Sequence, residues 1–231
     1  MLSAESLLQV WEGGHRRPVA DRSLHLLAQA LPHASRDTLS RIDLPTRDWH
    51  LLQLRRQWFG SSLEGYADCP SCGERMEIAV DAADVAGECP QDSPSFVSQD
   101  GRRFRLPTVG DLASLANIDD PEAATHQLLE RCSLDDAHGS NLPAILQEVD
   151  EGLAALAAAR GFYLTLSCTG CGNPSQHALD PADYLWAEVS AGAAALLEEV
   201  HLLATHYGWA EHDILAMSPT RRRAYLSRIE S

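Results

Sequence analysis

The sequence predicts an α+β protein that is mainly helical, with a small zinc-ribbon-like β element built from two distant C-x-x-C knuckles. Apolar residues recur at helical spacing over most of the 231 residues, and a few short segments alternate as strands do. Two C-x-x-C motifs, Cys69 to Cys72 and Cys168 to Cys171, lie beside such segments. With 45% hydrophobic residues the chain can bury a core, so we expect residues 1–231 to form a single domain.

The N-terminal part, residues 1–65, is expected to form helices. They run from Ser3 to Trp11, from about Pro18 to Leu31 and from about Pro45 to Phe59. Ser3 is a suitable N-cap, and Gly60 can adopt the left-handed conformation that ends a helix. We interpret the stripe of Trp49, Leu52 and Phe59 as core.

Residues 66–106 are expected to hold the first zinc knuckle and a β-hairpin. Tyr66 to Cys72 and Met76 to Val80 flank the knuckle, and the second of these alternates like a half-buried strand. The hairpin joins Ser95–Val97 to Phe104–Leu106 through an Asp-Gly turn.

The remaining chain is expected to alternate helices with the second knuckle. Residues 107–161 contain three inserted helices, over 108–116, 121–132 and 142–160. Residues 162–180 form the second knuckle, between strands over 162–166 and 176–179. Residues 181–231 form C-terminal helices over 181–207, 211–217 and 219–229, the last with Ser218 as N-cap.

The cysteine pattern indicates a metal site. Paired C-x-x-C motifs in a chain without a signal peptide are typical of a zinc ion held by four thiolates, here Cys69, Cys72, Cys168 and Cys171. Two intervening residues let one tight turn direct both sulfurs at one ion, and a glycine after each second cysteine permits a left-handed turn. Cys89 and Cys132 have no partner at this spacing, and we do not expect either to be a ligand.

The separation of the knuckles does not exclude a shared ion. Closing the loop over residues 73–167 costs roughly 4 kcal/mol, whereas a structural zinc supplies about 10–16 kcal/mol. The main alternative is two independent reduced C-x-x-C turns without metal. A zinc with four thiolates has no open position for water, and no hydrolase, phosphate-loop or metalloprotease motif is present, so we expect a structural zinc and no enzyme.

Charge limits the partners. The 18 basic residues, all arginine, face 33 acidic ones, which gives a net charge of −15. Such a field repels phosphate backbones, so no nucleic acid is expected as a partner. There is neither a basic, apolar N-terminal leader nor an apolar run of 18 residues, so we expect a cytoplasmic protein with no membrane partner.

Several segments in order resemble one protein family. They are Leu7 to Glu12, Trp58 to Gly60, Leu63 to Gly73, Phe104 to Thr108, the second knuckle, Glu199 to Ala204, Tyr207 to Trp209, Ile214-Leu215 and Arg221 to Leu226. Together they resemble the baseplate hub assembly chaperone family of contractile-tailed phages, whose relatives are encoded with phage-tail-like contractile injection systems. Thr169 stands where such knuckles often carry proline, which leaves the cysteines intact.

The resemblance implies a non-enzymatic assembly factor or structural component of the baseplate or hub of a contractile tail or contractile injection system. Its partners would be baseplate, hub or spike proteins, and it could be incorporated in a phage-tail-like particle. The alternative function is a zinc-ribbon adaptor that binds nucleic acid or protein in a transcription-like complex. Aromatic and arginine side chains dominate binding hot spots, which makes these residues candidates for a partner surface: Trp186, Tyr207, Trp209, Arg221, Arg222, Arg223 and Tyr225.

Overall fold

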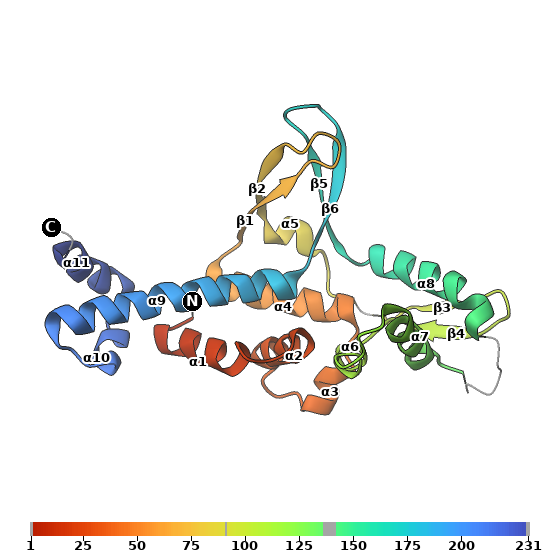
Figure 1. The fold of residues 1–231 in the computed structure, drawn as a ribbon, viewed down its shortest axis with the longest axis horizontal. Helices are drawn as coiled ribbons and strands as arrows, with labels where there is room; N and C mark the ends of the chain where they lie inside the picture. Colours follow the sequence, from red (N-terminus) through yellow and green to blue (C-terminus); the bar gives the residue numbers. More distant parts are fainter. Residues whose placement is uncertain (1, 91, 136–141, 230–231) are drawn as a thin grey trace.

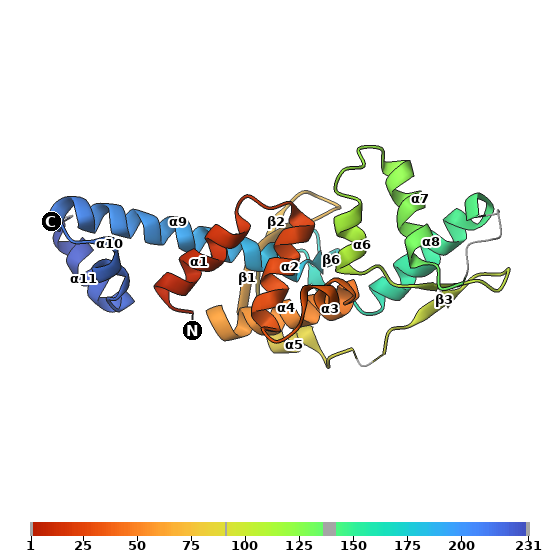
Figure 2. The same cartoon turned by 90° about the horizontal axis from the view of Figure 1, so that it is seen from below.

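The computed structural model describes residues 2–90, 92–135 and 142–229 and shows an elongated α+β molecule (Figure 1). The long helix α9 (Pro181–Tyr207) extends from the centre of the molecule to one end. Four parts adjoin it or its neighbours: a helical body, a tower of two hairpins, a lobe at the opposite end and a C-terminal cap. Figure 2 shows the lobe and the cap at opposite ends of the long axis.

The helical body consists of the first half of α9 together with α1 (Ala4–Gly14), α2 (Val19–Ala30), α3 (Arg36–Ser40) and α4 (Leu44–Phe59). Local signals set the ends of these helices. The side chains of Ser3 and Asp43 accept hydrogen bonds from Ser6 N and Thr46 N, at 3.1 and 2.9 Å, and thereby cap α1 and α4. Gly208 ends α9 in the left-handed conformation, with φ 70°.

The core of the body is aliphatic. Leu27 of α2, Leu51 of α4 and Leu185 of α9 are completely buried in one cluster. At its edge Arg55 of α4 forms a two-pronged ion pair with Glu188 of α9, with N···O distances of 2.8 and 2.7 Å. The body is therefore held by apolar burial between helices that are distant in sequence.

The tower consists of two antiparallel hairpins that project from the body (Figure 1). The first pairs β1 (Ser62–Asp68) with β2 (Arg75–Asp81), and the second pairs β5 (Phe162–Ser167) with β6 (Pro174–Leu179). Buried or partly buried residues alternate with exposed ones along β1 and β2, as the sequence predicted for the second strand. The short helix α5 (Ala82–Ala86) follows β2 at the base of the tower.

The lobe contains a second cluster built around a third hairpin, β3 (Ser95–Val97) and β4 (Arg103–Arg105), with α7 (Pro121–Cys132) and α8 (Leu142–Ala158). Phe104 of β4 is fully buried against α7 and α8. The short helix α6 (Val109–Ser114) joins the lobe to the body, because Val109 packs in the core of the body. The segment expected over 66–106 is thus divided: its knuckle lies in the tower, and its hairpin lies in the lobe.

The C-terminal cap consists of α10 (Glu211–Leu215) and α11 (Pro219–Ile229), which fold back against the end of α9. Ser218 Oγ accepts a hydrogen bond from Arg221 N at 3.3 Å, which confirms it as the N-cap of α11. Leu8 of α1 meets Leu196 of α9 beside the cap.

Most expected elements are present with ends shifted by a few residues, and the predicted mainly helical α+β class is confirmed. Two short helices, α3 and α5, were not predicted, because five residues are too few to show helical periodicity. The expectation for Phe59 was wrong: it lies at the last turn of α4 with 36% of its surface exposed. Among the described residues, no helix has the length and apolarity that a membrane span requires.

Candidate metal centre

The two knuckles at the tip of the tower have the same backbone geometry. In the first, Cys69 N donates to Glu74 O at 2.8 Å and Gly73 N donates to Cys69 O at 2.9 Å. The second repeats these bonds from Cys168 N to Asn173 O, at 3.0 Å, and from Gly172 N to Cys168 O, at 2.8 Å. Gly73 and Gly172 have φ angles of 76° and 73°, which other residues adopt only with strain. Each C-x-x-C-G sequence therefore folds locally into the turn that its glycine permits.

The tertiary structure brings the four sulfurs together. The Sγ atoms of Cys69 and Cys171 lie 3.8 Å apart, those of Cys72 and Cys168 lie 3.6 Å apart, and all four lie within 4.8 Å of one another. In a tetrahedral site with metal–sulfur bonds of about 2.3 Å, sulfurs are about 3.8 Å apart. The four cysteines thus fit a single tetrahedral metal ion, to which each hairpin contributes two ligands.

The electrostatics of the thiols also favour a cation. The backbone N–H groups of Ser71 and Cys72 point at the Cys69 sulfur and lower the pKa of this thiol to about 7. The N–H of Glu74 acts in the same direction on Cys72, but the facing thiols of Cys171 and Cys168 raise the pKa of Cys72 to about 12. Without a cation, the neighbouring sulfurs resist ionising together, and a bound metal ion reverses this by stabilising every thiolate.

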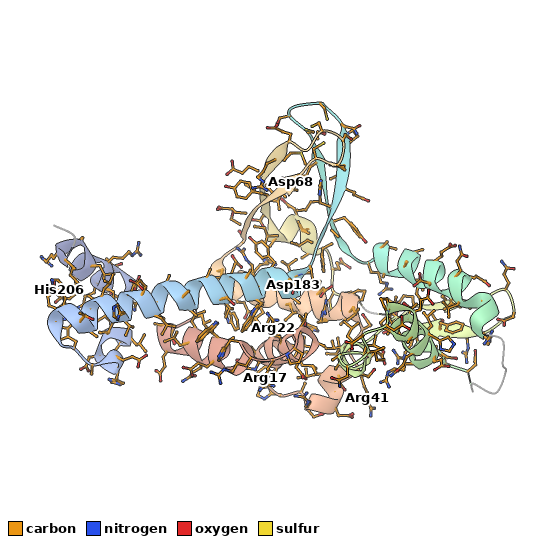
Figure 3. The ribbon with its side chains drawn as sticks, in the orientation of Figure 1. Arg17, Arg22, Arg41, Asp68, Asp183 and His206 are labelled. Carbon is orange, nitrogen blue, oxygen red and sulfur yellow. The ribbon has the colours of Figure 1, made fainter. Side chains whose placement is uncertain are left out.

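Burial and cross-contacts hold the two knuckles in register. Cys69 and Cys168 are each 3% exposed and pack with Met76, whereas Cys72 and Cys171 face solvent. The side-chain amide of Asn173 in the second knuckle donates to Ser71 Oγ in the first. Asp68, the last residue of β1 and the neighbour of Cys69, lies on the tower below its tip (Figure 3).

A second set of contacts joins the hairpins at the base of the tower. Leu63 of β1, Phe162 of β5 and Leu52 of α4 are buried in one cluster. Tyr184 of α9 makes two hydrogen bonds to the backbone of Glu64 in β1: its hydroxyl donates to Glu64 O at 2.8 Å and accepts from Glu64 N at 3.0 Å. The hairpins are therefore connected at both ends, by apolar packing and Tyr184 at the base and by the cysteines at the tip.

The two remaining described cysteines are not part of this site. Cys132 is completely buried in the lobe, and this desolvation raises the pKa of its thiol to about 11. Cys89 lies partly buried in the loop after α5 and is not among the four clustered thiols. Neither lies in the cysteine cluster, as the spacing predicted.

The residues predicted to form a partner surface do not form one surface. Trp186 packs in the body, where Arg22 stacks over its ring at 5.0 Å. It lies 21 residues before Tyr207 on α9, or about 30 Å along the helix at 1.5 Å per residue. Figure 3 shows His206, the neighbour of Tyr207, at the far end of the molecule.

The other predicted partner residues gather on the C-terminal cap. The Tyr207 and Trp209 rings stack at 4.5 Å, and Tyr225 meets the Trp209 ring edge-on at 4.8 Å. Arg221 lies over Tyr225 at 5.9 Å and, like Arg223, is exposed. Arg222 differs: it is 5% exposed and donates to Glu199 Oε2 at 2.7 Å and to Met217 O at 2.8 Å. These two bonds join α11 to the end of α9 and the turn that precedes α11.

Sequence reasoning missed the residues that position the tower. Tyr184 follows the N-cap of α9 by four residues, and no motif marks its contact with Glu64.

Within the described part of the chain, no other group of three or more His, Cys, Asp or Glu side chains converges as the four cysteines do. The cysteine cluster can therefore bind a metal ion with four protein ligands, an arrangement that leaves no position for a substrate.

Comparisons with protein-family models, with curated proteins and with solved structures found no match to this chain.

Proposed function

We propose that this protein is a non-enzymatic assembly factor or structural component of the baseplate or hub of a contractile tail or contractile injection system. The observation that carries the proposal is the tower, in which four cysteines from two distant hairpins converge at a tip that projects from an elongated helical body. A metal ion saturated by four thiolates stabilises a shape and does not activate a substrate. The segments that resemble the hub chaperone family are the reason for proposing a contractile tail or injection system.

We propose that the bound metal is Zn²⁺ in a structural role. Four thiolates in a closed tetrahedral set are typical of structural zinc, and the sulfur spacings of 3.6 and 3.8 Å suit its bond length. Iron can occupy a similar ligand set, so the metal requires a direct measurement. Protein purified without added metal should contain one zinc per chain by elemental analysis, and an iron signal with its visible absorbance would contradict the assignment.

The proposed partners are baseplate, hub or spike proteins of the tail. Two surfaces in the described part of the chain are candidates for binding these partners. The tower exposes 70% of Tyr66 beside the acidic strand residues of the first hairpin. The cap presents the partly exposed Tyr207, Trp209 and Tyr225 rings beside Arg221 and Arg223. Partly exposed aromatic and arginine side chains are enriched at the centres of interfaces.

Particle assembly provides the test of this proposal. In the cell that encodes the protein, deletion of its gene should leave few complete tails, and electron microscopy would count them. A Trp209→Ala variant should bind hub or spike proteins less well in co-purification, while a Tyr163→Ala variant, altered on the exposed face of β5, serves as the matched surface control. Normal numbers of intact particles in the deletion strain would overturn the proposed function.

The nucleic-acid form of the adaptor alternative gains no support from the charge around the tower. The first hairpin region, residues 62–81, contains five acidic residues and one arginine, and residues 162–179 contain no Asp, Glu, Lys or Arg. This surface repels a phosphate backbone. A binding constant for DNA or RNA that falls steeply with salt would be needed to restore this alternative.

A further inference from the structure

Three arginine side chains converge on a groove of about 450 Å³ where the body meets the lobe. Arg41 comes from the end of α3, Arg105 from β4 and Arg131 from α7. Ser40, Thr108, Gly110 and Asp111 complete the lining. Figure 3 shows Arg41 beside α3, on the side of the molecule away from the tower.

A buried carboxylate orients two of these guanidinium groups. Asp111 is 1% exposed, and its oxygens accept from Arg105 Nη1 at 2.6 Å and from Arg131 Nε at 2.9 Å. Thr108 adds hydrogen bonds from its backbone N–H, at 2.9 Å, and its hydroxyl, at 2.8 Å. Although Asp111 belongs to the groove lining, only 1% of it is exposed, and the two guanidinium groups that it orients compensate its charge.

The groups facing the groove carry more positive than negative charge. Asp111 neutralises one of its two guanidinium partners. Among the described residues Arg41 pairs with Asp37 alone, in an exposed ion pair whose side chains are 78% and 71% accessible. Such exposed pairs contribute little and exchange readily with other anions. Within the described part of the chain, the terminal nitrogens of Arg131 have no hydrogen-bond partner.

We propose that this groove, defined by Arg41, Arg105 and Arg131, binds a phosphate group. Guanidinium groups bind phosphate with paired hydrogen bonds, and here they approach from three separate elements, which suits a tetrahedral anion more than a planar carboxylate. Arg131 and Arg41 contact the ligand. Arg105 is a positioning residue, because it binds Asp111, which in turn orients Arg131. The groove is larger than inorganic phosphate, so a small phosphate monoester fits the same position. This inference does not depend on the proposed assembly function.

Calorimetric titration with inorganic phosphate tests the proposal. Sodium chloride keeps the ionic strength constant, because general screening would otherwise imitate binding. We expect saturable binding with one site per chain, and binding at least about tenfold weaker in Arg41→Gln and in Arg131→Gln, as expected for the loss of a hydrogen bond to a charged group. Glycerol phosphate in a parallel titration distinguishes a monoester ligand from the free ion by its tighter binding.

Arg36→Gln is the matched control. Arg36 is the first residue of α3, which Arg41 follows as C-cap. Its side chain is 69% exposed and does not line the groove, so this variant should bind phosphate as the unchanged protein does. Arg131→Gln removes a bond to Asp111, so its melting curve is recorded, and the exposed Arg41→Gln variant gives the decisive comparison. Absence of saturable binding, equal binding in Arg41→Gln, or acetate binding as tight as phosphate would each overturn the proposal.

Discussion

The tower and the helical body are held together by different forces. The body buries a large aliphatic cluster from α1, α2, α4 and α9. Among the described residues, the buried cluster at the tip of the tower consists of Cys69, Met76 and Cys168, with Ala67 and Leu166 packed against them. Apolar burial contributes about 25 cal/mol per Å². A cluster of this size therefore cannot by itself order two hairpins, each of which is marginally stable alone. The metal ion that we propose for the four cysteines would take the place of this missing core.

This difference implies that the two regions respond to different perturbations. Removing a ligand should affect the tower and spare the body, whereas a cavity in the body should lower the stability of the whole chain. The junction of body and lobe, where Asp111 binds Arg105 and Arg131, is a third case, which is held by charge and hydrogen bonds. Five variants test this division, from the largest expected effect to the smallest.

Cys72→Ser should have the largest effect. It removes one of four ligands, and the tower then loses most of the roughly 10–16 kcal/mol that a structural zinc supplies. We expect loss of bound metal by elemental analysis and loss of amide-exchange protection in β1, β2, β5 and β6, with the helical circular dichroism retained. Protected tower amides in a metal-free variant would contradict the comparison.

Asp111→Asn should come next. It leaves Arg105 and Arg131 without their buried carboxylate, which costs about 3–5 kcal/mol in unfolding free energy. Burial alone would raise the pKa of Asp111, but hydrogen bonds from Arg105 and Thr108 lower it to about 2. The pKa of Asp111 in the folded protein is thus below its ordinary value of 3.8, so the stabilisation is present above about pH 4 and is lost as pH falls towards 2.

Chemical denaturation of both proteins across this pH range measures the effect. The unchanged protein should lose stability between about pH 4 and pH 2 by a larger amount than Asp111→Asn does, since the variant has no carboxyl to titrate at this position. If the stability of the two proteins changed with pH in the same way, Asp111 would not stabilise the junction of body and lobe.

Leu27→Ala tests the apolar core of the body. Leu27 is completely buried, and a leucine-to-alanine change in such a position costs about 2–5 kcal/mol. Denaturant unfolding should show this loss while elemental analysis still finds the metal in the folded protein. A variant that loses metal at the same time would mean that the tower depends on the body more than the separate clusters indicate.

Tyr184→Phe tests the attachment of the tower to α9. The hydroxyl makes two hydrogen bonds to Glu64, and their loss should cost about 1 kcal/mol. Amide exchange at the base of β1 should become faster, while the metal content is unchanged. Tyr163→Phe, altered at an exposed tyrosine of β5, is the control and should leave exchange at Glu64 as it was.

Cys89→Ser should have the smallest effect. Cys89 lies outside the cluster of four thiols, so metal content should stay the same and stability should change by less than about 0.5 kcal/mol. Thermal unfolding and elemental analysis check both quantities. A loss of metal in this variant would show that the ligand set has been misassigned.

The sequence by itself determined the strands, the four cysteines of the candidate site and all the helices except the short α3 and α5. These features are local: Gly73 and Gly172 permit the same left-handed turn, Ser3 and Asp43 each cap a helix by binding an N–H group three residues further on, and periodic leucines specify a buried face. The sequence also named seven residues for a partner surface, but Trp186 packs in the body and Arg222 is buried against Glu199.

Only the tertiary structure decided which distant residues meet. It closed the two cysteine pairs into one cluster, placed Tyr184 against Glu64, and brought Arg41, Arg105 and Arg131 around Asp111. The physical reason is that a turn or a cap depends on neighbours along the chain. A contact between elements depends instead on how apolar faces pack, and residue spacing does not encode that packing.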